Sequence, residues 1–476
     1  MQIIRARALL ALSTLALVAA GCGSDTPAPT TDQAQLRVIH ASSDAPAVDV
    51  YAKGNTTPLF TNVKYGDTTA FKSVNAGTVQ VELRATGSAA SSTPAYTSPT
   101  LTLTKDQKID AIAAGLLAST DPASSFRIVP LVEGFTAPAA GKIKVRIVHA
   151  GADAPTVGLD VGNDGSVEVP SLARFADTGA AGVELPAATD LQVGVVAGSP
   201  AAPVTAFTVP ALPAGTQAIV IATGLLAKEP RESNGFALLA AGVGFVKQNP
   251  RVYTLHLSPD APAVDVFLGT TELIDNLSFG QLKGIQAPPT AAGYTLDIFG
   301  HTAGSTRPPG NPVASPSTGK LDAGEKYLLI ADGFLTPPSG NGNAFTVLKF
   351  QEGFDLTDAA NARVRLVHGA PDVPAVDIGV VAGGSVTQPP VASNVPYKAE
   401  SGIAGLSLPA ATLPVGIAVA GSPTPVVTFS VTTAAGLRAF AIAGGSLNNV
   451  GGNGVKLYIV NTGASPWTVA AIAPNT

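Results

Sequence analysis

One stretch of about fifteen residues occurs four times in this chain at nearly equal intervals. It reads HASSDAPAVDVYAKG from His40, and related stretches begin at His149, His256 and His368. Successive histidines are separated by 109, 107 and 112 residues. Since this interval is the length of one ordinary β-sandwich, the spacing predicts four similar domains in tandem.

A second signature, Ile-Ala-x-Gly-x-Leu, keeps a fixed distance from the first. Its glycines lie 75, 75, 77 and 77 residues after the histidines, and they are Gly115, Gly224, Gly333 and Gly445. Repeats two and four also share LPAAT and VAGSP, whereas repeats one and three share DAPAVDV followed by an aromatic residue. This pattern indicates that a two-domain unit was duplicated.

Within a repeat, apolar residues alternate with polar ones. KIKVRIVHA places Ile143, Val145 and Ile147 on one face, which is typical of a half-buried strand. The 50 glycines and 39 prolines interrupt the chain too often for long helices. We therefore expect an all-β fold of four tandem immunoglobulin-like antiparallel β-sandwich domains, joined by short links into a jointed rod. The predicted domains are residues 36–138, 139–247, 248–357 and 358–476, the last with a C-terminal tail.

The N-terminus has the form of a secretion signal. Arg5 and Arg7 precede an apolar run that is too short to span a bilayer. The run ends in VAAGC, which resembles the lipobox of bacterial lipoproteins and implies cleavage of residues 1–21 and attachment of lipid to Cys22. An ordinary signal cut nearby is the alternative. We expect residues 22–35 to form a lipidated cysteine and a flexible tether. By the same resemblance, the protein would be exported and anchored in the cell envelope, at the outer membrane.

Composition excludes several classes of site. Cys22 is the only cysteine, so the mature chain has no disulfide, no cysteine nucleophile and no cysteine-rich zinc site. The formal net charge of −5 becomes −7 when Arg5 and Arg7 leave with the signal. No basic run is present to follow a phosphate backbone, and we expect no nucleic-acid partner.

The motif histidines have the parity of the core residues in their strands, so each should point inward. An aspartate follows each histidine by four residues, at a proline-containing turn. We expect a buried polar pair, with the aspartate accepting the imidazole N–H and pinning the turn. The alternatives are a metal site, for which one histidine and one aspartate are too few ligands, and a catalytic site. We predict no catalytic residue, metal or cofactor. The four predicted structural pairs are His40 with Asp44, His149 with Asp153, His256 with Asp260, and His368 with Asp372.

A second aspartate alternates with core valines and should therefore face away from the core. It is Asp49 in repeat one, beside Tyr51, and Asp265 in repeat three, beside Phe267. Such an acid–aromatic pair could contact a sugar or protein partner, or it could be an ordinary solvated strand face. In repeat two, residues 160–168 loosely resemble a calcium loop, but Asn-Asp-Gly favours a hairpin turn.

RVIHASSDAPAVDVYAKG and its three relatives resemble the domain of unknown function 4397 family, which is found in secreted and surface proteins, often in tandem. The resemblance covers nearly all of residues 36–465 and implies the architecture, but no activity.

Common enzyme motifs such as Gly-x-Ser-x-Gly and His-Glu-x-x-His are absent from the sequence. We expect a non-enzymatic, membrane-anchored envelope lipoprotein that serves as an adhesion, scaffolding or spacer module. The alternative is a binding protein for an envelope carbohydrate or small ligand. Expected partners are the membrane, through the lipid anchor, and an envelope polysaccharide or a surface protein.

Overall fold

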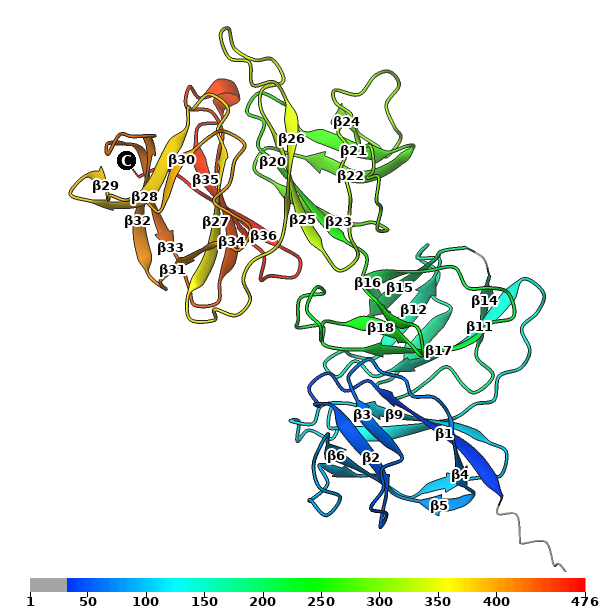
Figure 1. Ribbon diagram of the computed structural model, residues 1–476. Helices are drawn as coiled ribbons and strands as arrows, with labels where there is room; N and C mark the ends of the chain where they lie inside the picture. Colours follow the sequence, from blue (N-terminus) through cyan, green and yellow to red (C-terminus); the bar gives the residue numbers. More distant parts are fainter. Residues whose placement is uncertain (1–31, 188, 200, 476) are drawn as a thin grey trace, which may run out of the picture.

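The computed structural model describes residues 32–187, 189–199 and 201–475 (Figure 1). Apart from one short 3-10 helix, η1 (Val450–Gly452), the regular structure of these residues consists of strands. The predicted all-β architecture of tandem sandwiches is thus confirmed. The predicted signal peptide and Cys22 lie outside the described residues. Within the described part of the chain, no helix has the length and apolar character needed to cross a membrane.

Domain 1 is a sandwich of two four-stranded sheets. The first has the order β10-β9-β1-β4 and the second the order β3-β2-β6-β7, and β5 and β8 form a small ribbon beside them. Val38, Val50, Leu83 and Ile109 belong to the apolar core of this domain. The strands are β1 (Gln33–His40), β2 (Val48–Ala52), β3 (Phe60–Val63), β4 (Lys72–Asn75), β5 (Gly77–Val79), β6 (Val81–Ala85), β7 (Tyr96–Thr97), β8 (Leu101–Leu103), β9 (Lys108–Ala114) and β10 (Arg127–Val132).

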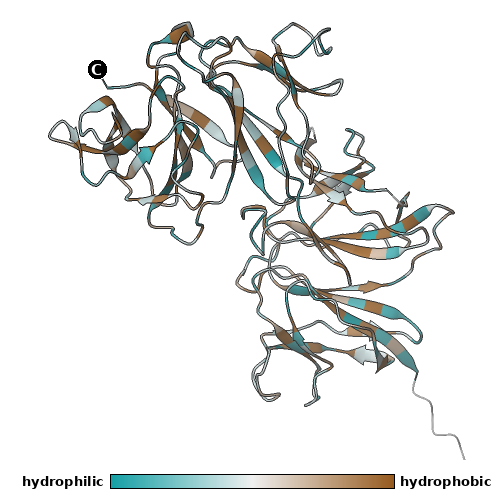
Figure 2. Cartoon of the chain, turned by 45° about the horizontal axis from the view of Figure 1, so that its top comes forward, coloured by the Kyte–Doolittle hydropathy of each residue, from teal (hydrophilic) through white to brown (hydrophobic). Residues whose placement is uncertain are grey.

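Domain 2 repeats this plan with the sheet orders β14-β11-β17-β18-β19 and β13-β12-β15-β16. Its strands are β11 (Lys142–His149), β12 (Val157–Val161), β13 (Val169–Leu172), β14 (Val183–Pro186), β15 (Leu191–Ala197), β16 (Ala202–Val209), β17 (Gln217–Thr223), β18 (Ala237–Ala240) and β19 (Gly244–Val246). Along the strands, hydrophobic and hydrophilic residues alternate as the sequence predicts (Figure 2).

Domain 3 has the sheet orders β23-β20-β25-β26 and β22-β21-β24. Its strands are β20 (Arg251–His256), β21 (Val264–Leu268), β22 (Thr271–Leu277), β23 (Leu282–Gln286), β24 (Asp297–Gly300), β25 (Lys326–Asp332) and β26 (Thr346–Gln351).

Domain 4 has the sheet orders β31-β27-β34-β35-β36 and β29-β28-β32-β33, and β30 also pairs with β28. Its strands are β27 (Ala362–Gly369), β28 (Val376–Ala382), β29 (Ser385–Val386), β30 (Ala392–Val395), β31 (Leu406–Leu408), β32 (Thr412–Val419), β33 (Pro425–Thr432), β34 (Arg438–Gly444), β35 (Lys456–Asn461) and β36 (Thr468–Ile472).

One strand pair in every domain is parallel. The strand that ends in the motif histidine lies beside the strand of the Ile-Ala-x-Gly-x-Leu signature, as β1 beside β9 and β11 beside β17. The same holds for β20 with β25 and for β27 with β34. The sandwiches are therefore mixed, not purely antiparallel as expected. Alternation of side chains is the same in both kinds of pair, so it could not distinguish them.

The domains associate in two pairs with shared apolar cores (Figure 1). Ile39 and Ile112 lie on the outer face of the first sheet of domain 1, where they pack with Val148 and Ile221 of domain 2. Domains 3 and 4 form the same kind of contact through residues such as Leu255, Ile330, Val367 and Ile442. A central strand such as β1 is therefore buried on both faces. The prediction of a jointed rod is therefore wrong within each pair, because adjacent sandwiches pack sheet against sheet.

Repeats one and three each end in a Gly-Phe dipeptide, whose phenylalanines are Phe135 and Phe354, and both lie at these pair contacts. A Cβ on Gly182 would lie 3.0 Å from the Phe135 ring, and a Cβ on Gly405 would lie 2.9 Å from the Phe354 ring. In both pairs a phenylalanine of the odd domain thus packs against a glycine of the even domain. This equivalence supports the duplication of a two-domain unit.

Polar contacts connect the first pair to the second. Glu229 of domain 2 pairs with Lys326 of domain 3 at 2.6 Å, and Arg231 pairs with Glu352 at 2.9 Å. The boundary between domains 2 and 3 therefore differs in character from the apolar contacts within the pairs.

The C-terminal tail is part of the fold. β36 adds a strand to the first sheet of domain 4, and Trp467 precedes it. The Trp467 indole stacks on the Tyr253 ring of domain 3, with 4.3 Å between ring centroids and 9° between planes. The tail therefore helps to close the contact between domains 3 and 4. At the other end, β1 begins at Gln33, so the predicted tether of residues 22–35 extends into the first strand.

Asp332 lies buried where domains 3 and 4 meet. Its Oδ1 accepts the Gly333 N–H, and its Oδ2 lies near the Tyr397 hydroxyl of domain 4 without a hydrogen bond of ordinary geometry. Burial raises the pKa of Asp332 to about 7. Domain 2 has Thr223 at this position, and its hydroxyl donates to the Ala41 carbonyl of domain 1 at 2.6 Å. In the pair of domains 1 and 2, a threonine at the position of Asp332 thus has a hydrogen-bond partner for its hydroxyl.

We predict that Asp332→Thr stabilises the pair of domains 3 and 4 at pH 8, by up to about 4 kcal/mol. Between the usual pKa of 3.8 and the raised pKa of about 7, the unfolded chain releases the Asp332 proton and the folded chain keeps it. The folded protein therefore loses stability as the pH rises through this window. The gain should therefore shrink steadily as the pH falls from 7 toward 4. Urea unfolding of variant and wild type at matched pH measures it, and a gain independent of pH would contradict the assignment.

Candidate functional site

The four motif histidines are fully buried, and each uses both ring nitrogens. The exposed fractions of His40, His149, His256 and His368 are 0%, 0%, 0% and 1%. Nε2 lies 3.2, 2.8, 3.0 and 2.9 Å from the carbonyl oxygen of the proline six residues later. Nδ1 accepts the backbone N–H of the residue two positions on, at 3.3 to 3.4 Å. This pattern places the proton on Nε2 and leaves no free lone pair.

The protonation of these rings follows from their surroundings. Burial lowers the pKa of all four histidines, and the hydrogen bond to the proline carbonyl opposes the shift without reversing it. A neutral imidazole with both nitrogens occupied can neither bind a metal nor take up a proton without breaking a bond. The predicted inward orientation is confirmed, and the geometry favours the structural interpretation over a metal or catalytic site.

The motif aspartates do not pair with the histidines, and that part of the prediction is wrong. Asp44 accepts the backbone N–H groups of Leu117 and Ala118 at 2.8 and 2.9 Å. The turn directs the carboxylate away from the ring and toward the loop that follows the Ile-Ala-x-Gly-x-Leu strand. The same two bonds, at 2.7 to 3.0 Å, are made by Asp153, Asp260 and Asp372.

The signature glycines make this connection possible. Gly115 has φ +81°, and a Cβ there would overlap the carbonyl oxygen of Ser125. The equivalent glycines have φ +86°, +78° and +96° and the same close approach to a backbone carbonyl. The aspartate of the first motif and the glycine turn of the second thus form one structural unit.

The second aspartate is buried, which contradicts the predicted exposed partner contact. The exposed fractions of Asp49 and Asp265 are 7% and 0%, and Tyr51 and Phe267 beside them are buried as well. Asp49 accepts the N–H of Asn62 at 2.8 Å, and Asp265 accepts that of Asn276 at 2.8 Å. These asparagines have positive φ and stand where the neighbouring strand bulges. The bulge and the following loop cover the carboxylate, so the outward face of the strand is not a solvent face. Asp377 is bonded in the same way, to Asn394 N–H at 2.7 Å.

The stretch that resembles a calcium loop has the geometry of a turn. The Asp160 carboxylate accepts the backbone N–H groups of Asp164 and Gly165 at 3.0 and 2.8 Å. Those bonds close the turn between β12 and β13. The turn interpretation accounts for the geometry without an ion.

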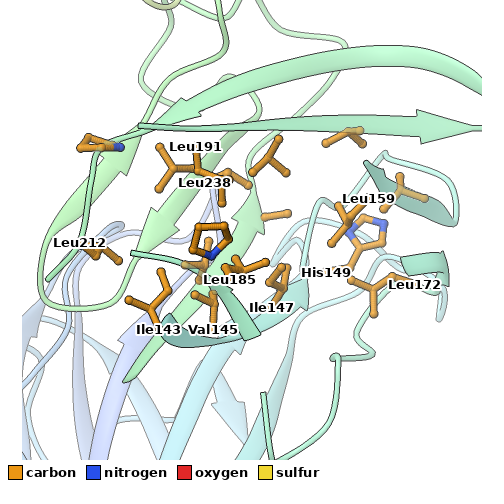
Figure 3. Close-up of a pocket in the computed structure, with 18 of the residues that line it drawn as sticks. Ile143, Val145, Ile147, His149, Leu159, Leu172, Leu185, Leu191, Leu212 and Leu238 are labelled. Atoms are coloured by element: carbon orange, nitrogen blue, oxygen red, sulfur yellow. The ribbon is translucent and has the colours of Figure 1, made fainter. Parts of the chain in front are cut away.

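An apolar cavity lies between the two sheets of domain 2 (Figure 3). Ile143, Val145, Ile147 and His149 point into it from β11, and Leu185 of the LPAAT segment closes one side. Its volume is about 60 Å³, and domain 4 has a similar cavity of about 50 Å³ beside Leu408. An apolar cavity that binds benzene measures about 150 Å³. These spaces are therefore packing voids of the even-numbered domains.

The profile of the family described as "Domain of unknown function (DUF4397)" matches residues 34–160 and 250–379. The chain belongs to the DUF4397 family. Each matched region begins in the first strand of an odd-numbered domain, β1 or β20, and ends in the following even-numbered domain, so that it contains the histidine motifs of both, which agrees with a tandem arrangement of DUF4397 domains.

Other comparisons add little to the family assignment. No curated protein matches this DUF4397 chain. Among solved structures, the Bacillus anthracis TIE protein matches over 88% of this chain and 67% of its own, at 8% sequence identity and a TM-score of 0.15. A match of this quality does not bear on the function of the DUF4397 protein.

The sequence interpretation missed one group of side chains. Of the five histidines, His301 is the one that lies outside the repeated motif. The fold brings it to Asp265 and Asp275 of domain 3, with ligand-type atoms of all three residues within 4.8 Å of one another. The signal in the sequence was a histidine that only one repeat has, but its neighbours could not be inferred without the strand register.

Proposed function

We propose that this DUF4397 protein is a non-enzymatic, lipid-anchored envelope protein that serves as a rigid spacer or scaffold. The supporting observation is that all four copies of its most specific motif are used in internal hydrogen bonds. Each histidine is hydrogen-bonded to a proline carbonyl and to a backbone N–H, and each aspartate accepts hydrogen bonds from two backbone N–H groups. A motif used in this way stabilises domains and leaves binding to their outer surfaces.

Paired domains suit a spacer because they resist bending. Within each pair, apolar residues of two sheets form one continuous core, so relative motion would expose buried hydrophobic surface. Two such units in series are therefore stiffer than four freely jointed sandwiches would be. A lipid on Cys22 would place this body at a membrane surface, with the tether residues between them.

The anchor is tested by changing its attachment residue. We predict that Cys22→Ser moves the protein from the membrane fraction to the soluble fraction, because removal of the thiol removes the acyl chains that hold it. Fractionation with immunoblotting measures the shift, and mass spectrometry of the wild-type N-terminus identifies the lipid. Ser24→Ala is the matched control and should stay in the membrane fraction. A wild-type N-terminus without lipid would contradict the proposal.

Carbohydrate binding is a second candidate, favoured by a groove where domains 2, 3 and 4 meet. The groove has a volume of about 370 Å³ and is lined by residues that include Arg251, Tyr253, Gln286 and Trp467. This volume falls within the range of small-ligand sites, about 300–1,000 Å³. Retention of the chain on immobilised envelope polysaccharides, lost in Gln286→Ala, would favour this function over a pure spacer.

A further inference from the structure

Three side chains of domain 3 converge at one end of its smaller sheet. Asp265 lies on β21, Asp275 on β22, and His301 directly follows β24. His301 Nδ1 is 2.8 Å from Asp265 Oδ1 and 3.4 Å from Asp275 Oδ1. The side chain of Asp265 is fully buried, whereas those of His301 and Asp275 are 31% and 61% exposed. Asp265 therefore forms the buried part of this group, and His301 and Asp275 are accessible to solvent.

Repeats one and four have the same buried aspartate as repeat three, but they lack His301 and Asp275. Asp49 and Asp377 each accept two backbone N–H groups in the same way as Asp265. In repeat one the Thr86 hydroxyl also donates to Asp49, at 3.2 Å, whereas in repeat four the two backbone bonds hold the aspartate without a side-chain donor. Thr86 and Ala420 occupy the position of His301 in repeats one and four, and each donates the equivalent backbone bond. Thr61 and Ser393 precede the bulge asparagine where repeat three has Asp275. Only repeat three thus combines an imidazole with a second carboxylate.

A third carboxyl group adds to the negative charge. Glu272 is on β22 with Asp275, and its Oε1 is buried without a hydrogen-bond partner. Burial, and then the charges of Asp275 and Asp265, raise the pKa of Glu272. The site thus contains more acceptor oxygens than the neighbouring donors satisfy.

The distances fit a bound cation. Ligand atoms about 2.0–2.2 Å from a metal ion lie about 3.0–3.5 Å apart in tetrahedral or octahedral geometry, close to the 2.8 and 3.4 Å that separate Nδ1 from the two carboxylate oxygens. One imidazole nitrogen and two carboxylate oxygens suit zinc or a related transition metal better than calcium, which takes oxygen ligands.

We propose that Asp265, Asp275 and His301 bind one divalent transition-metal ion, with Zn²⁺ preferred over Ca²⁺. The ion occupies the place of the proton between His301 Nδ1 and Asp265 Oδ1. In the neutral ring that proton moves to Nε2, and from the imidazolium it is released to solvent. Water completes the coordination on the exposed side. This ion would tie β21 and β22 to the loop after β24 and so stabilise domain 3.

The test uses the chain from residue 23 to 476, which keeps every described residue. Equilibrium dialysis against Zn²⁺ should give one bound ion per chain, and the melting temperature should rise by several degrees in excess Zn²⁺ but not in Ca²⁺. Asp275→Asn should weaken Zn²⁺ binding about tenfold or more and clearly reduce the rise. It should leave the metal-free melting temperature unchanged, because the Asp275 carboxylate contacts only His301 among the described charged groups.

Asp322→Asn is the matched control, since it removes one exposed carboxylate of the same domain, paired only with Lys320. It should bind Zn²⁺ as the wild type does. His301→Ala should lose binding as Asp275→Asn does. The proposal is overturned if no Zn²⁺ binds, if Asp275→Asn binds as well as Asp322→Asn does, or if His301→Ala retains the metal-dependent rise.

Discussion

Acidification below pH 6.5 is expected to destabilise the pair of domains 1 and 2, with a slope of at most about 2.7 kcal/mol per pH unit, whereas in the pair of domains 3 and 4 the raised pKa of Asp332 opposes this loss. Each pair contains two motif histidines that are buried and uncharged, and burial lowers their pKa from the usual 6.5. Between the lowered pKa and 6.5, the unfolded chain binds a proton that the folded chain does not. Stability is therefore complete above pH 6.5 and is lost as the pH falls through this window.

Urea unfolding of residues 32–249 at pH 7, 6 and 5 measures this slope in the first pair alone. His40→Gln is the informative variant, because its amide can donate to the Pro46 carbonyl but does not titrate. It should lower stability at pH 7 and reduce the slope by about half. Burial raises the pKa of Asp110 in the same pair, which acts in the opposite direction at lower pH. An unchanged slope in His40→Gln would show that the histidine is not the titrating group.

The second large effect is expected at the contact within a pair. Ile112 is 0% exposed, yet it points away from the core of its own sandwich and into the core shared with domain 2. Ile112→Asp removes that packing and introduces a carboxylate without a partner, so we expect a loss of more than about 4 kcal/mol. Val243→Asp, at a position 79% exposed, is the control and should change stability by less than about 0.5 kcal/mol. If both variants unfold alike, the shared core does not stabilise the pair.

Much of the fold could be read from local pattern. The spacing of His40 and its counterparts predicts the tandem repeats, and the parity of Ile143, Val145 and Ile147 predicts which way β11 faces. The sequence also contained a signal for the pairing of domains. A strand buried on both faces is expected to be continuously apolar, and residues 111–114 form such a run. Within a single sandwich such a run has no explanation, because one face would be exposed to water.

The errors concern contacts that local pattern does not specify. The partners of Asp44 are 73 and 74 residues away, and no spacing within a turn predicts them. Asp49 was expected in solvent because alternation describes a regular strand, whereas a bulge at Asn62 turns a backbone N–H toward the carboxylate. His301 reaches Asp265 only because β21 and β24 are neighbours, and that register is a property of the folded sheet.

Calorimetry of residues 23–476 tests most directly whether the two pairs are the units of folding. Trp467, the only tryptophan, lies at the contact between domains 3 and 4, so its fluorescence reports the second pair. We predict two cooperative transitions, one of which coincides with the fluorescence change, and no stable fold for residues 32–138 alone. Four separate transitions, or a fragment of residues 32–138 that melts as it does in the whole chain, would contradict the shared cores.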